Sequence, residues 1–219
     1  MSFARSPRTE PTSTTARAPS LVLTVVGELL WAGAYAAGAI AAVGTGKVAF
    51  PIPATVLNIS WEAAFLFWRP PARRITRALY GVWFALDLVL LGQAWMWAWR
   101  LPPGHPLYVS GLVSIALGLV AAFALHAVLY RRFRKANLEA FAINAVMSLL
   151  FVWTILFHPQ HLVASPVVAV LKLLGTGLIS VANLVSWRSS GSRLPKGPST
   201  VMLVIASMDL VYLLLILAR

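Results

Sequence analysis

Seven runs of apolar residues, each close to 20 residues long, take up most of this chain of 219 residues. About 20 apolar residues in a helix are needed to cross the ~30 Å hydrocarbon core of a bilayer. In lipid the backbone must satisfy its own hydrogen bonds, and spans of this length do so as helices rather than strands. We therefore expect an all-α fold, an integral membrane bundle of seven transmembrane helices in one domain over residues 21–219. The predicted spans are residues 21–44, 51–68, 77–99, 107–130, 138–157, 162–187 and 199–218.

Charged residues are scarce and lie mostly outside these runs. They make up 11% of the chain, against about 25% in an average soluble domain. Residues 1–20 combine Ser, Thr, Pro and Arg with almost no aliphatic side chains, which predicts a disordered basic tail. The first run contains Glu28 and is too long for the apolar part of a signal peptide, so it should be retained as a span. The absence of cysteine excludes disulfides, thiolate metal sites and cysteine nucleophiles.

The distribution of basic residues predicts the orientation. Of the 18 Lys and Arg residues, 14 lie in the tail and in the loops after the second, fourth and sixth spans. The opposite side holds only Lys47, Arg100 and Arg219. Because Lys and Arg are enriched in cytoplasmic loops, the N-terminus should be cytoplasmic. The net charge of +12 then serves contact with anionic lipid headgroups and not with nucleic acid.

Four of the six acidic residues lie inside spans: Glu28, Glu62, Asp87 and Asp209. A carboxyl group in hydrocarbon is costly, so these side chains should face the bundle interior and are candidates for function. The helical rise of ~1.5 Å per residue places all four roughly 10–16 Å from the cytoplasmic ends of their spans. We expect one polar cavity reached from the cytoplasm. Glu28 and Asp87 can equally be structural, each bonded to a neighbouring helix.

Aromatic residues share helix faces with these acids, because positions three or four apart are neighbours on a helix surface. Burial favours the protonated form of a carboxylic acid, and aromatic ring faces stabilise positive charge without attacking it. The combination is suited to making and keeping a carbocation. The residues expected to contact the substrate are Asn58, Trp61, Phe65, Glu28, Trp31, Trp83, Asp87 and Tyr212.

Other residues in the spans have simpler explanations. Asn144 and Asn183 are expected to hydrogen-bond between helices. His126 lacks the spacing of a metal ligand, so we expect no metal site. Lys172 either neutralises a carboxylate or extends to the interface, and both alternatives stay open. Glu139, at the edge of the fifth span, is expected to be dispensable. Tryptophans near the span ends are expected in interfacial belts, namely Trp68, Trp95, Trp97, Trp99 and Trp187.

Two short motifs resemble those of a known family of membrane enzymes. The second span carries Asn58-Ile59-Ser60-Trp61-Glu62, which resembles an N-x-x-W-E motif, and Phe65 follows it. The last span carries Asp209-Leu210-Val211-Tyr212, which resembles a D-x-V-Y segment. Both are typical of the small membrane-integral class II terpene cyclases of fungal meroterpenoid and indole-diterpene pathways. The chain is most similar to bacterial members that cyclise farnesylated indole diketopiperazines in drimentine-type pathways.

The resemblance implies a cyclisation started by a proton and needing no cofactor. An acid protonates a terminal alkene or epoxide, the polyene closes into fused rings, and a base removes the final proton. Glu62 and Asp209 match the two essential acids of the family, and we favour Glu62 as the first donor because Trp61 and Phe65 flank it. The implied partners are a farnesylated small molecule and membrane lipid, in a bacterial cytoplasmic membrane or in the endoplasmic reticulum of a fungus.

The absence of certain motifs limits the classes of reaction that the chain can be expected to catalyse. The chain has no D-D-x-x-D or N-D-x-x-D cluster to hold magnesium and diphosphate, and no D-x-D-D motif of the large class II cyclases. A retinal protein would need a lysine in the last span, where this chain has Asp209. A small proton-coupled or solute transporter would also place carboxyl groups at mid-depth, but an internal repeat would be expected there and none is visible. The transporter stays as the alternative function, and the exact substrate stays open.

Overall fold

The computed structural model describes residues 17–68, 70–71, 74–101, 106–132, 138–190 and 196–219. Over these residues the only β-type pairing is an isolated bridge between Val48 and Leu162, and the predicted all-α fold with seven helices is confirmed. Most of the predicted N-terminal tail, residues 1–16, lies outside the described residues. The helices are α1 (Arg17–Ala42), α2 (Ile52–Ala63), α3 (Arg74–Trp99), α4 (Pro106–Arg132), α5 (Leu138–Phe157), α6 (Pro166–Ser189) and α7 (Lys196–Leu217).

Helix α2 differs from the other six. In the described part of the chain, six helices are long and apolar enough to cross a membrane, and α2 is not among them. It has 12 residues and continues as a π-helical turn, η1, over Ala64–Trp68. Together they only just reach the lower limit of about 17 residues for a transmembrane helix. Eight of the 12 residues of α2 are buried, so this short helix is the central element of the bundle.

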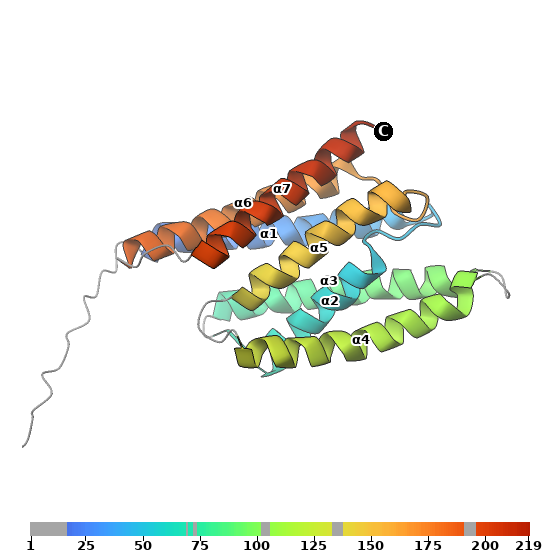
Figure 1. Ribbon diagram of the computed structural model, residues 1–219, viewed down its shortest axis with the longest axis horizontal. Coiled ribbons are helices and arrows are strands. Elements are labelled where there is room, and N and C mark those ends of the chain that lie inside the picture. The colour runs from blue at the N-terminus through green and yellow to red at the C-terminus, as the bar shows by residue number, and fades with distance from the viewer. Residues whose placement is uncertain (1–16, 69, 72–73, 102–105, 133–137, 191–195) are drawn as a thin grey trace, which may run out of the picture.

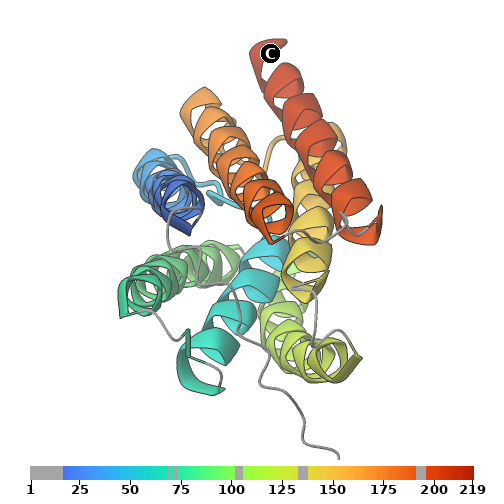
Figure 2. The same ribbon diagram turned by 90° about the vertical axis from the view of Figure 1, so that its left-hand side faces the viewer.

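Helix α2 lies among α3, α4 and α5, while α6 and α7 lie farther away on the opposite side of the bundle (Figures 1 and 2). Helix α2 packs against α3, α4 and α5, while α1 packs against α6 and α3, and α7 packs against α5 and α6. Glycines allow the close approach of α1 and α6. A Cβ atom on Gly27 would lie 2.9 Å from the carbonyl oxygen of Gly175, and one on Gly175 would lie 2.9 Å from Cδ1 of Trp31.

The two ends of the bundle are built differently. At one end, the backbone N–H of Val48 donates to the carbonyl of His161 (2.9 Å), and the N–H of Val163 donates to the carbonyl of Val48 (2.9 Å). These bonds join the loop between α1 and α2 to the loop between α5 and α6, and Phe50 in the first loop is buried against the rings of Tyr35 and Phe151. We call this the closed end. The opposite end, here the basic end, carries Arg74, Arg77, Arg188 and Lys196.

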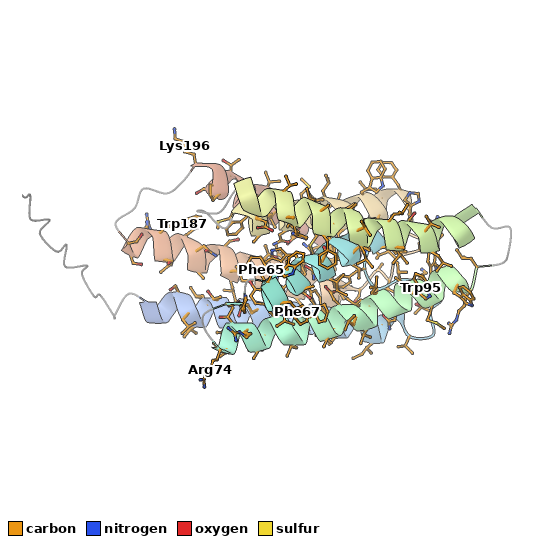
Figure 3. The ribbon with its side chains drawn as sticks, turned by 90° about the horizontal axis from the view of Figure 1, so that it is seen from below. Phe65, Phe67, Arg74, Trp95, Trp187 and Lys196 are labelled. Carbon is orange, nitrogen blue, oxygen red and sulfur yellow. The ribbon has the colours of Figure 1, made fainter. Side chains whose placement is uncertain are left out.

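The outer surface is apolar, as a lipid-facing surface should be. Large hydrophobic side chains are exposed on every one of the six long helices. Trp68, Trp95 and Trp99 are exposed near helix ends. Trp187 lies near Lys196 at the basic end, whereas Trp95 lies toward the other end (Figure 3). Trp68, Trp95 and Trp99 therefore lie where interfacial tryptophans are expected, whereas Trp97 and Trp187 are partly buried and pack against the core.

Candidate active site

A cavity of about 350 Å³ lies inside the bundle and extends toward the basic end, where Pro71 and Thr76 line it. This volume is in the range of small-molecule sites. Helix α1 contributes one stripe of its face to the cavity: Thr24, Glu28, Trp31 and Tyr35. Their spacing of four, three and four residues keeps them on one side of the helix. The stripe therefore runs along the length of the cavity, from Thr24 near the mouth to Tyr35 at the floor.

The floor is a network of four buried polar side chains from three helices: Tyr35, Asn58, Glu62 and Asp87. Nδ2 of Asn58 donates to Oε1 of Glu62 (2.9 Å) and to Oδ2 of Asp87 (2.6 Å), and it also contacts the hydroxyl of Tyr35. The Tyr35 hydroxyl donates to Oε1 of Glu62 (3.3 Å). Asn58 and Tyr35 reach the cavity surface, whereas Glu62 and Asp87 lie directly behind them and are fully buried.

The carboxyl groups of Glu62 and Asp87 form a pair. They lie close together, because both accept a hydrogen bond from Nδ2 of Asn58, and two neighbouring carboxyl groups in one buried site do not both ionise readily, so one of them holds a proton. No lysine or arginine forms a salt bridge with either group in the described part of the chain. The pair can therefore store one transferable proton at the floor of the cavity.

Aromatic rings form the wall above this floor. The ring centroids of Trp61 lie 4.9 Å from Phe65, 5.2 Å from Tyr80 and 6.5 Å from Trp83, and Tyr80 lies 5.2 Å from Trp83. We call these four residues the aromatic wall. Trp31 faces the cavity from α1, and its indole N–H donates to Oγ1 of Thr176 (3.2 Å). Ring faces of this kind stabilise a cation by ~0.5–2 kcal/mol each.

Glu28 is the one carboxyl group among the residues that line the cavity. Its side chain is 5% exposed, and its Oε2 atom receives no hydrogen bond from the described residues. Its backbone carbonyl accepts a hydrogen bond from the indole N–H of Trp83 (3.0 Å). This bond links α1 to α3 and places Glu28 beside the aromatic wall.

Asp209 belongs to a second polar cluster, away from the cavity surface. Nζ of Lys172 forms a salt bridge with Oδ1 of Asp209 and donates to Oγ of Ser148 (2.7 Å). The same Nζ lies 5.2 Å from the ring centroid of Trp31 and 5.4 Å from that of Phe151. Lys172 therefore neutralises a carboxylate and does not extend outward, which settles the alternative that the sequence left open.

The expected single cavity with four carboxyl groups is thus wrong in one respect. Glu28 lines the cavity and Glu62 and Asp87 lie behind its floor, but Asp209 is buried on the far side of Trp31. Tyr212 accompanies Asp209 and packs against Phe151, with 5.0 Å between ring centroids. It is fully buried and does not line the cavity. The prediction used the depth of the four carboxyl groups along their helices. Depth does not indicate the direction in which each side chain points from its helix.

Two other expectations need correction. Asn144 and Asn183 line the cavity, and Asn183 hydrogen-bonds within its own helix, to the carbonyl of Ile179 (2.8 Å), not between helices.

Glu139 is buried and pairs with His126, whose Nδ1 lies 3.2 Å from Oε1 of Glu139. Nε2 of His126 also lies 3.2 Å from the carbonyl of Leu57. Glu139 therefore takes part in holding α4, α5 and α2 together.

Sequence reasoning missed Tyr35 and Tyr80, although a signal existed. Tyr35 continues the spacing of Glu28 and Trp31 along α1, and Tyr80 lies three residues before Trp83 on α3. Neither carries a charge in mid-span, which was the feature used to find the site. As for metals, no group of three or more His, Asp and Glu side chains in the described ranges could hold a metal ion.

The fold and the cavity define a class of protein: a multi-pass helical membrane protein with an acid pair behind an aromatic internal cavity. The family model for Pyr4-like transmembrane terpene cyclases matches residues 6–215, nearly the whole chain, and the protein belongs to this family. It is therefore an integral membrane protein and a terpene cyclase. Neither a curated protein nor a solved structure matches the chain.

Proposed function

We propose that the protein is a class II cyclase that protonates the terminal alkene, or epoxide, of a farnesylated indole or related meroterpenoid and closes the chain into fused rings. The observation that carries the proposal is the Glu62–Asp87 carboxyl pair behind the floor of an aromatic cavity. Class II chemistry needs an acid that still holds its proton, in a site that excludes water. A neutral carboxylic acid among buried groups meets both requirements.

Glu62 is the proton donor in this proposal. Its Oε1 atom accepts hydrogen bonds from Asn58 and Tyr35, and these bonds stabilise the carboxylate that remains after the proton leaves. Asp87 shares the proton with Glu62 in the resting state and helps to return a proton to Glu62 after each turnover. Asp209 is engaged by Lys172, so it supports the site through that pair and through Trp31, and it does not deliver the first proton.

The shape of the cavity supports one orientation of the substrate. The apolar chain end reaches the floor, where the acid lies, and the polar head stays near the mouth. Polar side chains near the mouth, Thr24, Thr76, Asn144 and Asn183, offer hydrogen bonds to such a head. Oδ1 of Asn144 is buried and receives no hydrogen bond from the described residues, so a donor group on the substrate would satisfy it.

The reaction then proceeds from the floor toward the mouth. The Glu62 proton adds to one carbon of the terminal alkene, and the π electrons of the next alkene attack the tertiary cation that forms on the other carbon. Each attack closes a ring and moves the cationic centre toward the head of the substrate. The aromatic wall and Trp31 stabilise these cations. Loss of a proton at the end leaves an isomer of the substrate.

The test uses membranes that contain the protein and a farnesylated indole substrate. Wild-type membranes should convert it to a cyclic product of equal mass. Glu62→Gln keeps the shape of the side chain but removes its proton, and the rate should fall by at least the ~10²–10⁴-fold that general acid catalysis contributes. Phe67→Leu is the matched control, because Phe67 lies on the outside of η1 and is 67% exposed. A Glu62→Gln protein that is folded in the membrane and cyclises at the wild-type rate would falsify the proposal.

A further inference from the structure

We infer that Glu28 is the base that ends the cyclisation by removing the final proton. This inference rests on the proposed function and assigns a step that the floor network cannot perform. Glu62 becomes a carboxylate at the floor when it delivers its proton, but the last cation forms further along the chain. A second carboxyl group, nearer to the mouth, is needed at that point.

The environment of Glu28 suits a base and not a structural anchor. The carboxyl groups of Glu62 and Asp87 both accept hydrogen bonds from Asn58. Glu62 and Asp87 each keep one oxygen without a described partner, but both lie behind the floor. Glu28, by contrast, lines the cavity itself, is 95% buried, and its Oε2 atom receives no hydrogen bond from the described residues. It makes no salt bridge in the described part of the chain. A buried carboxyl oxygen without a partner costs free energy, and a positive charge on the substrate would compensate for it.

The position of Glu28 along the cavity matches the path of the cation. Tyr35 marks the floor, and Glu28 lies seven residues before it on the same helix stripe. At ~1.5 Å per residue this separates the two side chains by ~10 Å along the cavity axis. Two ring closures move the cationic centre from the chain end across two fused six-membered rings, in the same direction. The aromatic wall lies between the acid and the base, with Trp83 bonded to the backbone of Glu28 (3.0 Å).

The chemistry balances over one turnover. Glu28, as a carboxylate, takes a proton from a carbon next to the final tertiary cation, and the electron pair of that C–H bond becomes the new alkene. Glu28 then gives its proton to water at the mouth, and the Glu62–Asp87 pair regains one proton from water. Substrate and product have the same composition, and no oxidant, reductant or metal takes part.

The test measures the product distribution as well as the rate. Glu28→Gln leaves the proton donor intact, so the substrate should still be consumed. Without the base, the last cation should lose protons from several carbons or capture water. The fraction of the wild-type product should fall at least several-fold, replaced by alkene isomers and by an alcohol that is heavier by one water. Glu28→Asp keeps a carboxylate and should restore the wild-type product as the major one. Reaction in D₂O should place one deuterium at the initiation carbon in every variant.

Controls and contrary outcomes are distinct from those for the proposed function. Leu29→Ala, at a neighbouring position that is 54% exposed, should keep the wild-type product distribution. If Glu28→Gln does not accumulate in the membrane, Glu28→Ala carries the same expectation. An unchanged product distribution in these variants overturns the inference, even if the rate falls, because a structural residue would affect the rate alone. A folded variant that consumes no substrate also overturns it. If wild-type membranes give no isomer at all, it is the proposed function that fails.

Discussion

Lys172 and Asp209 form an ion pair with almost no exposure to solvent. Two buried charges neutralise one another, but removing one partner leaves the other charge uncompensated, typically at a cost of ~3–5 kcal/mol. The ammonium group of Lys172 also contacts the rings of Trp31 and Phe151. A change at Asp209 therefore reaches the cavity through Trp31, although Asp209 does not line it.

The Lys172–Asp209 pair gives a prediction that distinguishes a structural role of Asp209, as the partner of Lys172, from a role as a proton donor. Asp209→Asn leaves Lys172 charged and unpaired, so the thermal unfolding temperature of the purified protein in detergent should fall and activity should be lost. Lys172→Met combined with Asp209→Leu removes both charges, and the unfolding temperature should rise above that of either single variant. If Asp209→Asn unfolds at the wild-type temperature, the ion pair is not what makes Asp209 important.

At the residue scale, the sequence predicted which side chains of one helix share a face, but not which side chains of different helices contact one another. Helix periodicity placed Asn58 and Phe65 on one face with Glu62, and Trp61 was expected at the site from the N-x-x-W-E motif. All three line the cavity, whereas Glu62 lies behind its floor. The contact between Asn58 and Asp87, or between Lys172 and Asp209, joins different helices, and no spacing within one helix encodes it. The rotation of α7 about its axis relative to α6 decides that contact.

Among the helices, the close crossing of α1 and α6 positions two cavity residues. Gly27 and Gly175 meet at this crossing. Gly27 directly precedes Glu28 in the sequence, and Gly175 lies against Trp31. A larger residue at either glycine must push the two helices apart or move the Trp31 ring. The geometry of the cavity therefore depends on two residues that take no part in the chemistry.

We predict that Gly175→Ala lowers both stability and activity. Its Cβ atom would lie 2.9 Å from Cδ1 of Trp31 and 3.0 Å from the carbonyl oxygen of Gly27, and overpacking of this kind typically costs ~1–3 kcal/mol. Gly177→Ala, in the same helix, meets nothing within 4 Å and is the matched control. Thermal unfolding and cyclisation rates of the two variants should differ clearly. Equal values for both would show that the crossing tolerates a methyl group.

The sequence predicted the number of helices but not the character of α2. An apolar run is compatible with both α-helical and π-helical hydrogen bonding, so the pattern over residues 51–68 could not indicate the π-helical turn. Nor could it show that His126 contacts the carbonyl of Leu57 on α2 while pairing with Glu139. These contacts depend on how α4 and α5 pack against the central helix.

For the whole molecule, the basic residues predict that the cavity opens to the cytoplasm. The mouth lies toward the end that carries Arg74, Arg188 and Lys196, and the N-terminus of α1 lies at the same end (Figure 1). The positive-inside tendency then places the C-terminus outside. C-terminal fusions in a bacterial host should give active alkaline phosphatase and a dark fluorescent protein. A bright fluorescent fusion with inactive phosphatase would reverse this orientation.

The residues that line the cavity extend to the basic end, and the loops at the closed end are joined to one another at Val48 and Leu162, so we expect substrate and product to use the opening at the basic end. A farnesyl chain is flexible and can thread through a narrow opening one carbon at a time. The product is a rigid block of fused rings and must leave as a whole, by the same opening. The helices at the mouth must therefore separate further to release the product than to admit the substrate. For a cyclase of this shape, we expect the escape of the finished ring system, and not the formation of its bonds, to limit how often the catalyst can be reused.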